Sequence, residues 1–315
     1  MSHPMADLWH AIQAYRADLN AARRKIHAAP PIPQLVEEFS LKFAAQSAGS
    51  FLYILDNYNP NELSTTHYRI RNCYDPTAVV DRQLSEIAAD GLFAHADANE
   101  NGIIYCVTAK GWQFNERTRE LLRPRWQLPL PPAAEQDLMA LHRILSQLSE
   151  ATFADSTPMN AWATATRRDY GYKLSAEAAL PERIDARIFD LWAYRDDAHL
   201  AAWRPYHLSP FAWEAFTYIW NGQARTPEKL AEALHSREFS AQEWLNFIDE
   251  LEQLGWVRVD EAGHCTLTEV GKQVREAAEH ATDEFFYRPW TKVDQSELDE
   301  LRAVLKRLQA VLRAI

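Results

Sequence analysis

Cysteine and glycine are scarce in this chain of 315 residues, which has three cysteines and nine glycines. Cys73, Cys106 and Cys265 are an odd, widely spaced set without CxxC spacing, which argues against a disulfide framework and against a zinc site. So few glycines leave little room for phosphate-binding loops, and no GxSxG, P-loop, GxGxxG or HExxH motif occurs. The sequence gives no positive indication of catalysis, and we expect a protein that is not an enzyme and has neither cofactor nor metal.

Long apolar runs and a leader are also missing. No segment approaches the ~20 apolar residues that span a membrane, and the N-terminus lacks a basic start followed by an apolar stretch. With the free thiols, this predicts a cytoplasmic protein without membrane contact. The formal net charge of -11 gives no overall attraction to nucleic acid, although it permits a local basic patch.

Helix-forming residues are abundant, and one order of predicted helices and strands occurs twice in the chain. In the first copy we expect helices over 43–55, 61–71 and 76–89, with Asp75 as N-cap, then Gly91 as the stop, strands from Leu92 and over 103–107 around a turn at 97–102, and a helix opened by Thr108. In the second copy we expect helices over 211–220, 226–234 and 240–254, then Gly255, strands over 256–259 and 264–267, and a helix opened by Thr268. Each hairpin is followed by T-x-x-G, and the first hairpin is four residues longer.

The stretch DPTAVVDRQLSEIAADGLF at 75–93, followed by TAKG at 108–111, resembles the winged-helix domain of MarR-like proteins. The second copy is similar to that pattern mainly after Ile248. The run TDEFFYRPW at 282–290, with LAAW at 200–203, resembles a group of uncharacterised bacterial helix-turn-helix proteins. The resemblance implies a tandem winged-helix protein of the helix-turn-helix class.

We therefore predict a mainly α fold with small β-hairpins (α+β). Its divisions are an N-terminal helix and Pro-rich linker at 1–33, winged-helix domain 1 at 34–123, a Pro-rich linker and helical middle segment at 124–206, winged-helix domain 2 at 207–290, and a C-terminal amphipathic helix at 291–315.

A winged helix places its third helix in the major groove of double-stranded DNA, while basic groups nearby contact phosphates. The candidate DNA-binding residues of domain 1 are Thr66, His67, Arg69, Arg71, Thr77, Arg82 and Lys110. Asp81 and Glu86 on the same third helix oppose this, so the alternative is an ordinary charged surface. In domain 2, residues 240–255 contain no Lys or Arg but contain Glu243, Asp249, Glu250 and Glu252, which would repel phosphates. We expect domain 2 to have a structural or contact role.

Tryptophan is concentrated in the second half of the chain, with arginines near it in sequence. Such residues can bind a flat aromatic or anionic small molecule through stacking and guanidinium contacts. The candidate pocket residues are Trp162, Arg167, Trp192, Arg195, Trp203 and Trp213. The favoured alternative is that these tryptophans form helix-packing cores.

The last predicted helix, capped by Asp294 with Glu297 three residues on, has apolar residues at alternating three- and four-residue spacing from Leu298 to Ile315. This seam predicts either a homodimer or packing within one chain. Two functional hypotheses stay open: a DNA-binding transcriptional regulator that contacts DNA through domain 1, and a winged-helix scaffold that binds a ligand or a protein instead. A basic face around Arg82 supports the first; acidic neighbours, or another domain over the third helix, support the second.

Overall fold

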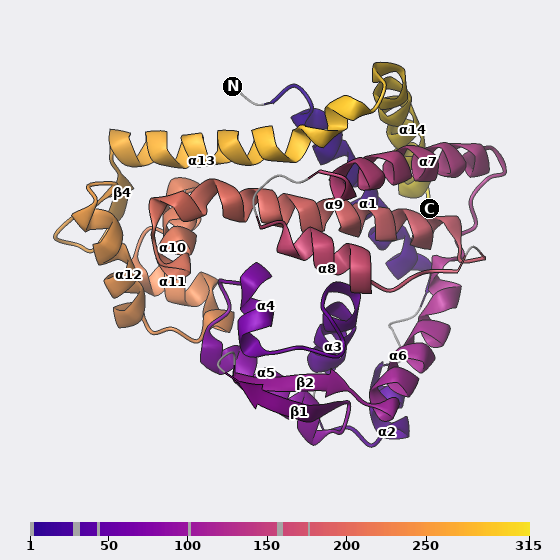
Figure 1. Ribbon diagram of the computed structural model, residues 1–315. Coiled ribbons are helices and arrows are strands. Elements are labelled where there is room, and N and C mark those ends of the chain that lie inside the picture. The colour runs from indigo at the N-terminus through magenta and orange to yellow at the C-terminus, as the bar shows by residue number, and fades with distance from the viewer. Residues whose placement is uncertain (1–2, 28–31, 43–44, 100–101, 156–159, 176) are drawn as a thin grey trace.

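The computed structural model describes residues 3–27, 32–42, 45–99, 102–155, 160–175 and 177–315. The chain is mainly α-helical with two small antiparallel hairpins, which confirms the predicted fold class. The residues described form three hydrophobic cores, one in a central helical bundle and one in each of two hairpin-containing units. Figure 1 shows helices α9 (Leu180–Trp203) and α13 (Glu269–Tyr287) side by side, with the second unit at one end of the pair and the first unit below it.

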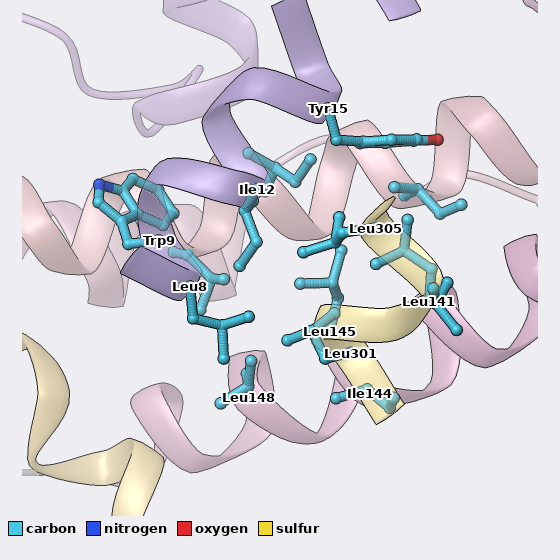
Figure 2. Packing of buried hydrophobic residues seen from close by; sticks show 14 of the residues in the cluster. Leu8, Trp9, Ile12, Tyr15, Leu141, Ile144, Leu145, Leu148, Leu301 and Leu305 are labelled. Atoms are coloured by element: carbon cyan, nitrogen blue, oxygen red, sulfur yellow. The ribbon is translucent and has the colours of Figure 1, made fainter. Parts of the chain in front are cut away.

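The bundle is built from α1 (Ala6–Ile26), α7 (Ala133–Phe153), α9, the end of α13 and α14 (Gln295–Arg313). Figure 2 shows apolar side chains of α1, α7 and α14 pointing toward one another, among them Ile12, Leu145 and Leu305. The predicted C-terminal seam is buried in this core from Leu298 to Leu312. Packing within one chain, one of the two predicted alternatives, therefore occupies the seam.

The first unit follows α1. Its elements are α2 (Ile32–Glu38), α3 (Ala45–Asn57), α4 (Thr65–Arg71), α5 (Thr77–Ala89), β1 (Phe93–Asn99), β2 (Gly102–Val107), α6 (Ala109–Leu122) and the 3-10 turn η1 (Arg123–Trp126). Buried aliphatic residues of α5 such as Leu84 and Ile87 pack on Phe51 of α3 and Phe93 of β1 in one core. Helix α8 (Trp162–Tyr170) then lies against α9, where the carboxylate of Asp197 accepts hydrogen bonds from the backbone N–H groups of Ala163 and Thr164.

The second unit continues from α9 through the short 3-10 turn η2 (Arg204–Tyr206). Its elements are α10 (Pro210–Trp220), α11 (Pro227–Ala233), the 3-10 turn η3 (His235–Arg237), α12 (Ala241–Gln253), β3 (Val257–Val259) and β4 (Cys265–Leu267), after which α13 returns to the bundle and ends near the 3-10 turn η4 (Pro289–Lys292). Ser240 caps α12 and forms a capping box with Glu243. Because the second unit follows α9 and ends in α13, it is covalently continuous with two bundle helices.

The T-x-x-G pattern has the same geometry in both units. The hydroxyls of Thr108 and Thr268 each accept a hydrogen bond from the N–H of the glycine three residues on, at 3.0 Å. A Cβ at Gly111 would lie 2.4 Å from the Leu92 carbonyl oxygen, and one at Gly271 would lie 2.1 Å from the Trp256 carbonyl oxygen. Only glycine fits here, because the start of the helix passes so close to the backbone just before the first strand of the hairpin. The pattern is therefore a packing requirement that both hairpins share.

Several local predictions need correction, and two fall partly outside the described residues. Asp75 is not the N-cap of α5, because the helix begins one residue later, after Pro76. Asp294 precedes α14 but makes no side-chain cap, and Glu297 pairs with Arg143 instead. The predicted helix at 61–71 begins only at Thr65, after Ser64. The prolines at 30 and 31 and the tip of the first hairpin at 100–101 lie outside the described residues.

Candidate nucleic-acid interface

The turn at residues 72–76 joins α4 to α5, and in a helix-turn-helix such a turn lies next to the DNA. Here it packs against the second unit and the end of α9. Cys73 is 6% exposed and belongs to the core of the second unit. The ring centroid of Tyr74 lies 6.1 Å from that of Trp203, and its hydroxyl lies 3.1 Å from Nε2 of His199. The turn of the first unit is therefore covered by protein.

Burial at this junction shifts the pKa values of a thiol and an imidazole in opposite directions. It raises the pKa of the Cys73 thiol to about 11, which leaves the thiol protonated and unreactive near neutral pH. It lowers the pKa of His199 to about 4, and the nearby Arg275 guanidinium acts in the same direction. His199 is therefore neutral at physiological pH.

The turns of the two units are joined by an ion triad. Arg237, in the turn before α12, pairs with Asp75 of the first unit and, at 2.8 Å, with Glu214 of α10. Burial raises the pKa of the carboxyl groups of Asp75 and Glu214, and Arg237 offsets this only in part. Burial acts to lower the pKa of Arg237, but the two carboxylates outweigh it and the pKa is raised. Each member of the triad therefore depends on the others for its charge.

Two predicted DNA-binding arginines are paired across the same junction. Arg82, on the exposed face of α5, forms an ion pair with Glu238 of the second unit. Arg71 is 7% exposed and pairs with Asp196 of α9 at 2.6 Å, while it donates a second hydrogen bond to Asn57. Arg71 cannot reach a phosphate in this arrangement, because its guanidinium is buried between the first unit and α9. Its assignment as a surface contact needs that correction.

The other predicted DNA-binding residues lie on α4, at the start of α5 and after the hairpin. Arg69 organises the turn, donating hydrogen bonds to the carbonyls of Asp75 and Cys73 and to the hydroxyl of Thr77. Lys110 donates to the carbonyl of Asp90 at 2.7 Å, and a ring nitrogen of His67 lies 3.1 Å from the carbonyl oxygen of Glu62. Thr66 is exposed on α4. Arg69 and Thr77 therefore lie at the turn, whereas Lys110 lies at the opposite, C-terminal end of α5.

Acidic side chains lie on the outward faces of both candidate recognition helices. On α5, Asp81 and Glu86 are exposed on either side of Arg82. On α12, Glu243, Asp249 and Glu252 are exposed, and the helix contains no Lys or Arg. An exposed carboxylate beside DNA repels phosphate, which supplies most non-specific affinity. The charge argument made from the sequence therefore applies to the folded surface as well.

The six residues predicted to line a ligand pocket are not gathered in one place. Trp162 packs on the first core, Trp192 packs against Trp9 in the bundle, and Trp203 and Trp213 stack in the second core. Arg195 pairs with Asp283 at 3.4 Å. Arg167 pairs with Asp190 at 2.9 Å and is the one of the six that faces the cleft beside the first unit. The four tryptophans therefore pack in hydrophobic cores, as the alternative interpretation expects.

The residues that join the units were not identified from the sequence. Arg237 and Glu238 follow a short helix, and no local pattern distinguishes them from other surface charges. Asp75 was noticed, but as a helix cap. The partners lie 156 and 162 residues apart in the chain, so only the folded arrangement brings them together.

Two further observations concern other kinds of site. Within the part of the chain that the structure describes, no group of three or more His, Cys, Asp or Glu side chains is placed to hold a metal ion. In the same residues, every helix is too short or too polar to cross a membrane.

Comparison with known proteins assigns a family. The model of a helix-turn-helix family matches residues 135–314, which is 180 of the 315 residues. No curated protein and no solved structure matches the chain. The matched part runs from α7 to α14 and so contains the second unit, whereas the first unit lies outside it. Helix-turn-helix units are a common means of binding DNA, which indicates a DNA-binding regulator at that coarse level. The chain belongs to this helix-turn-helix family.

Proposed function

We propose that this protein is a tandem winged-helix DNA-binding regulator in which the first unit contacts DNA and the second unit controls access to it. The observation that carries the proposal is that the turns of the two units face each other and are joined by ion pairs. Arg237 reaches Asp75 and Glu238 reaches Arg82, so each unit supplies a counter-charge to the other at the edge where a helix-turn-helix meets DNA.

The junction combines a small apolar contact at Cys73 and Tyr74 with many charged and polar groups, and this polar part favours separation over a permanent interface. A cavity of about 160 Å³ lies within it, lined by charged and polar groups that include Arg71, Asp196 and His199. Polar interfaces between parts of one chain are typical of parts that move relative to each other. Separation would release Arg82 from Glu238 and would uncover two residues of the turn, the buried Cys73 and the half-buried Tyr74.

Once uncovered, the first unit has the better charge for DNA. Arg69, Arg82 and Lys110 lie around its turn and helix, together with the polar groups of Thr66, His67 and Thr77. The second unit offers an acidic α12 to the same groove. Because phosphate contacts dominate non-specific affinity, we assign DNA contact to the first unit.

The test removes the acidic partners and keeps the cations. The variant Asp75→Asn/Glu238→Gln and the unmodified full chain are titrated with a fluorescein-labelled random duplex of ~20 base pairs, followed by anisotropy across a salt series. We expect the variant to bind at least ~10-fold more tightly at low salt, with a steeper dependence on salt, because more phosphates are contacted.

The matched control is Glu232→Gln/Glu276→Gln. It removes two exposed, ion-paired carboxylates of the second half of the chain, and so makes the same change in net charge away from the junction. We expect it to bind as the unmodified chain does. If neither the unmodified chain nor the junction variant retains DNA at low salt, the regulator assignment is wrong. If the control gains as much as the junction variant, net charge alone explains the gain and the second unit does not control access.

A further inference from the structure

A cleft of about 300 Å³ lies between the first unit and the bundle. Its lining comes from α1, α3, α6, α8 and α9, together with the end of η1 and the loop after α8. A volume of this size is typical of small-molecule sites. Side chains from so many elements converge here only in the folded chain.

Aromatic rings form the walls of the cleft, and arginines lie over two of them. The guanidinium carbon of Arg23 lies 3.4 Å from the ring centroid of Trp126, and that of Arg119 lies 3.6 Å from that of Tyr172. Tyr53 and Phe189 line the cleft from α3 and α9. Flat rings with cations above them favour a planar aromatic group between them.

Most charges in the cleft are already paired. The guanidinium of Arg119 pairs with Asp56, that of Arg167 pairs with Asp190 at 2.9 Å, and the carboxylate of Asp185 pairs with Arg16 at 2.6 Å. These pairs fix the lining but leave little net charge for a ligand to match.

Two charges of opposite sign have no ion-pair partner among the described residues. Arg23 donates hydrogen bonds to the carbonyl of Arg125 and to the side chain of Asn20, but it contacts no carboxylate there. Glu182, half-buried at the start of α9, accepts no hydrogen bond from any residue that the structure describes. Burial raises the pKa of Glu182, and the charges of Arg119, Arg123 and Arg23 only partly oppose this. Arg23 and Glu182 each lie near enough to influence the other's pKa, yet they do not form an ion pair.

We propose that this cleft binds a small aromatic zwitterion, such as an aromatic amino acid. The ring lies between the aromatic walls, the ammonium group donates hydrogen bonds to Glu182, and the carboxylate accepts hydrogen bonds from Arg23. Both unmatched charges are then paired, which removes the cost of leaving them half-buried without partners. The site does not depend on the proposed DNA binding, and it bridges the first unit and the bundle.

The test uses four probes that share one ring: L-tryptophan, tryptamine, indole-3-propionate and indole. Each is titrated by calorimetry into the full chain, without DNA. We expect tryptophan to bind at least ~10-fold more tightly than either singly charged probe and indole to bind most weakly, since a hydrogen bond to a charged group contributes on the order of 1.4 kcal/mol, or tenfold.

Two conservative variants assign the charges. Glu182→Gln should remove the advantage of tryptophan over indole-3-propionate, and Arg23→Gln should remove its advantage over tryptamine. The matched controls are Glu150→Gln on α7 and Arg24→Gln on α1, which change exposed residues of the same charge type outside the lining of the cleft. Thermal melts establish that each variant is folded.

Three results would overturn the proposal. The first is that no probe binds at millimolar concentration. The second is that all four probes bind equally, which would indicate an unspecific apolar cleft. The third is that Glu182→Gln and Arg23→Gln change the affinity for every probe alike, which would assign these residues a structural role.

Discussion

The two hairpin-containing units share a framework and differ in how they are held. Both have a helix pair, a hairpin and a helix that starts at T-x-x-G, with the same contacts from Thr108 and Thr268. The second unit is continuous with the bundle through α9 and α13. The first unit lies between α1 and α7 in the chain, and side-chain contacts hold it against the second unit and the bundle: the triad around Arg237, the buried turn at Cys73 and the walls of the cleft.

This difference shows that the fold of a unit and the surface it offers to a partner are determined separately. A shared local pattern is enough to form both units, because caps and close glycine contacts act within about twenty residues. What a unit presents to a partner depends on long-range contacts instead. The first unit resembles a DNA-binding domain in sequence, yet its turn is covered, whereas the second unit belongs to the matched family region and carries an acidic α12. The following predictions test that comparison.

The largest effect is expected at the triad that joins the units. Arg237→Met leaves Asp75 and Glu214, with side chains 26% and 10% exposed, without their cation. We expect the free energy of unfolding to fall by about 3 kcal/mol, because removing one partner strands the other charges. Urea unfolding followed by circular dichroism measures the loss.

A rescue distinguishes charge from packing in that variant. Asp75→Asn and Glu214→Gln, added to Arg237→Met, neutralise the stranded carboxylates and should restore much of the lost stability. If Arg237→Met alone leaves the unfolding midpoint unchanged, the triad does not hold the first unit in place.

The next effect is expected in acid, at the contact between the first unit and α9. The folded-state pKa of His199 is lowered to about 4 from 6.5, mainly by burial and by Arg275 and Arg195, while Glu279 acts in the opposite direction. The unfolded chain therefore takes up a proton on this ring before the folded chain does. The contribution of His199 is fully present above pH 6.5 and is lost progressively as the pH falls toward 4.

His199→Gln isolates this contribution. Glutamine stays neutral and can still contact the hydroxyl of Tyr74, so the slope of stability against pH between 6.5 and 4 should flatten. His235→Gln, a change at an exposed histidine of the second unit, is the control and should leave the slope intact. Equal slopes in the unmodified chain and His199→Gln would contradict the prediction.

A smaller effect, equal in kind for both units, is expected at the close glycines. Alanine at Gly111 or Gly271 would place Cβ at 2.4 or 2.1 Å from a backbone oxygen. We expect each to cost about 1–3 kcal/mol, as overpacked substitutions do, and Gly271→Ala to cost more. Gly49→Ala in α3 is the control, because its Cβ would meet nothing within 4 Å and should be neutral or stabilising. A neutral result at both close glycines would show that T-x-x-G is not a packing requirement.

These glycines also show how much the sequence can predict. The helix starts at Thr108 and Thr268 and the positions of both hairpins follow from local patterns, and the structure confirms them. Such features depend on neighbours in the chain, so a sequence contains the information directly.

The candidate sites depend on distant neighbours and could be predicted only in part. Asp75 looks like a helix cap, but a cation 162 residues away takes its carboxylate. The cleft near Arg167 combines side chains of α1, α3 and α9, and spacing within any one helix does not reveal that Arg23 and Glu182 face the same space. The positions of tryptophan in the sequence did not locate the cleft, because a large ring packs in a hydrophobic core as readily as it lines a pocket.

The smallest effect on stability is expected at Arg82, the outermost contact between the units. Its ion pair with Glu238 joins side chains that are both about half exposed, at 50% and 51%. Water and salt screen such pairs, so Arg82→Ala should leave the urea midpoint unchanged within error, and a double-mutant cycle with Glu238→Gln should show no coupling. The same variant should weaken DNA binding and lower its salt dependence if α5 contacts phosphates. A loss of stability from Arg82→Ala comparable to that from Arg237→Met would mean that the exposed pair, rather than the buried triad, holds the first unit against the second. If Arg82→Ala leaves stability unchanged but weakens DNA binding, Arg82 is one of the residues that contact DNA. The triad around Arg237 is then what keeps the two turns together.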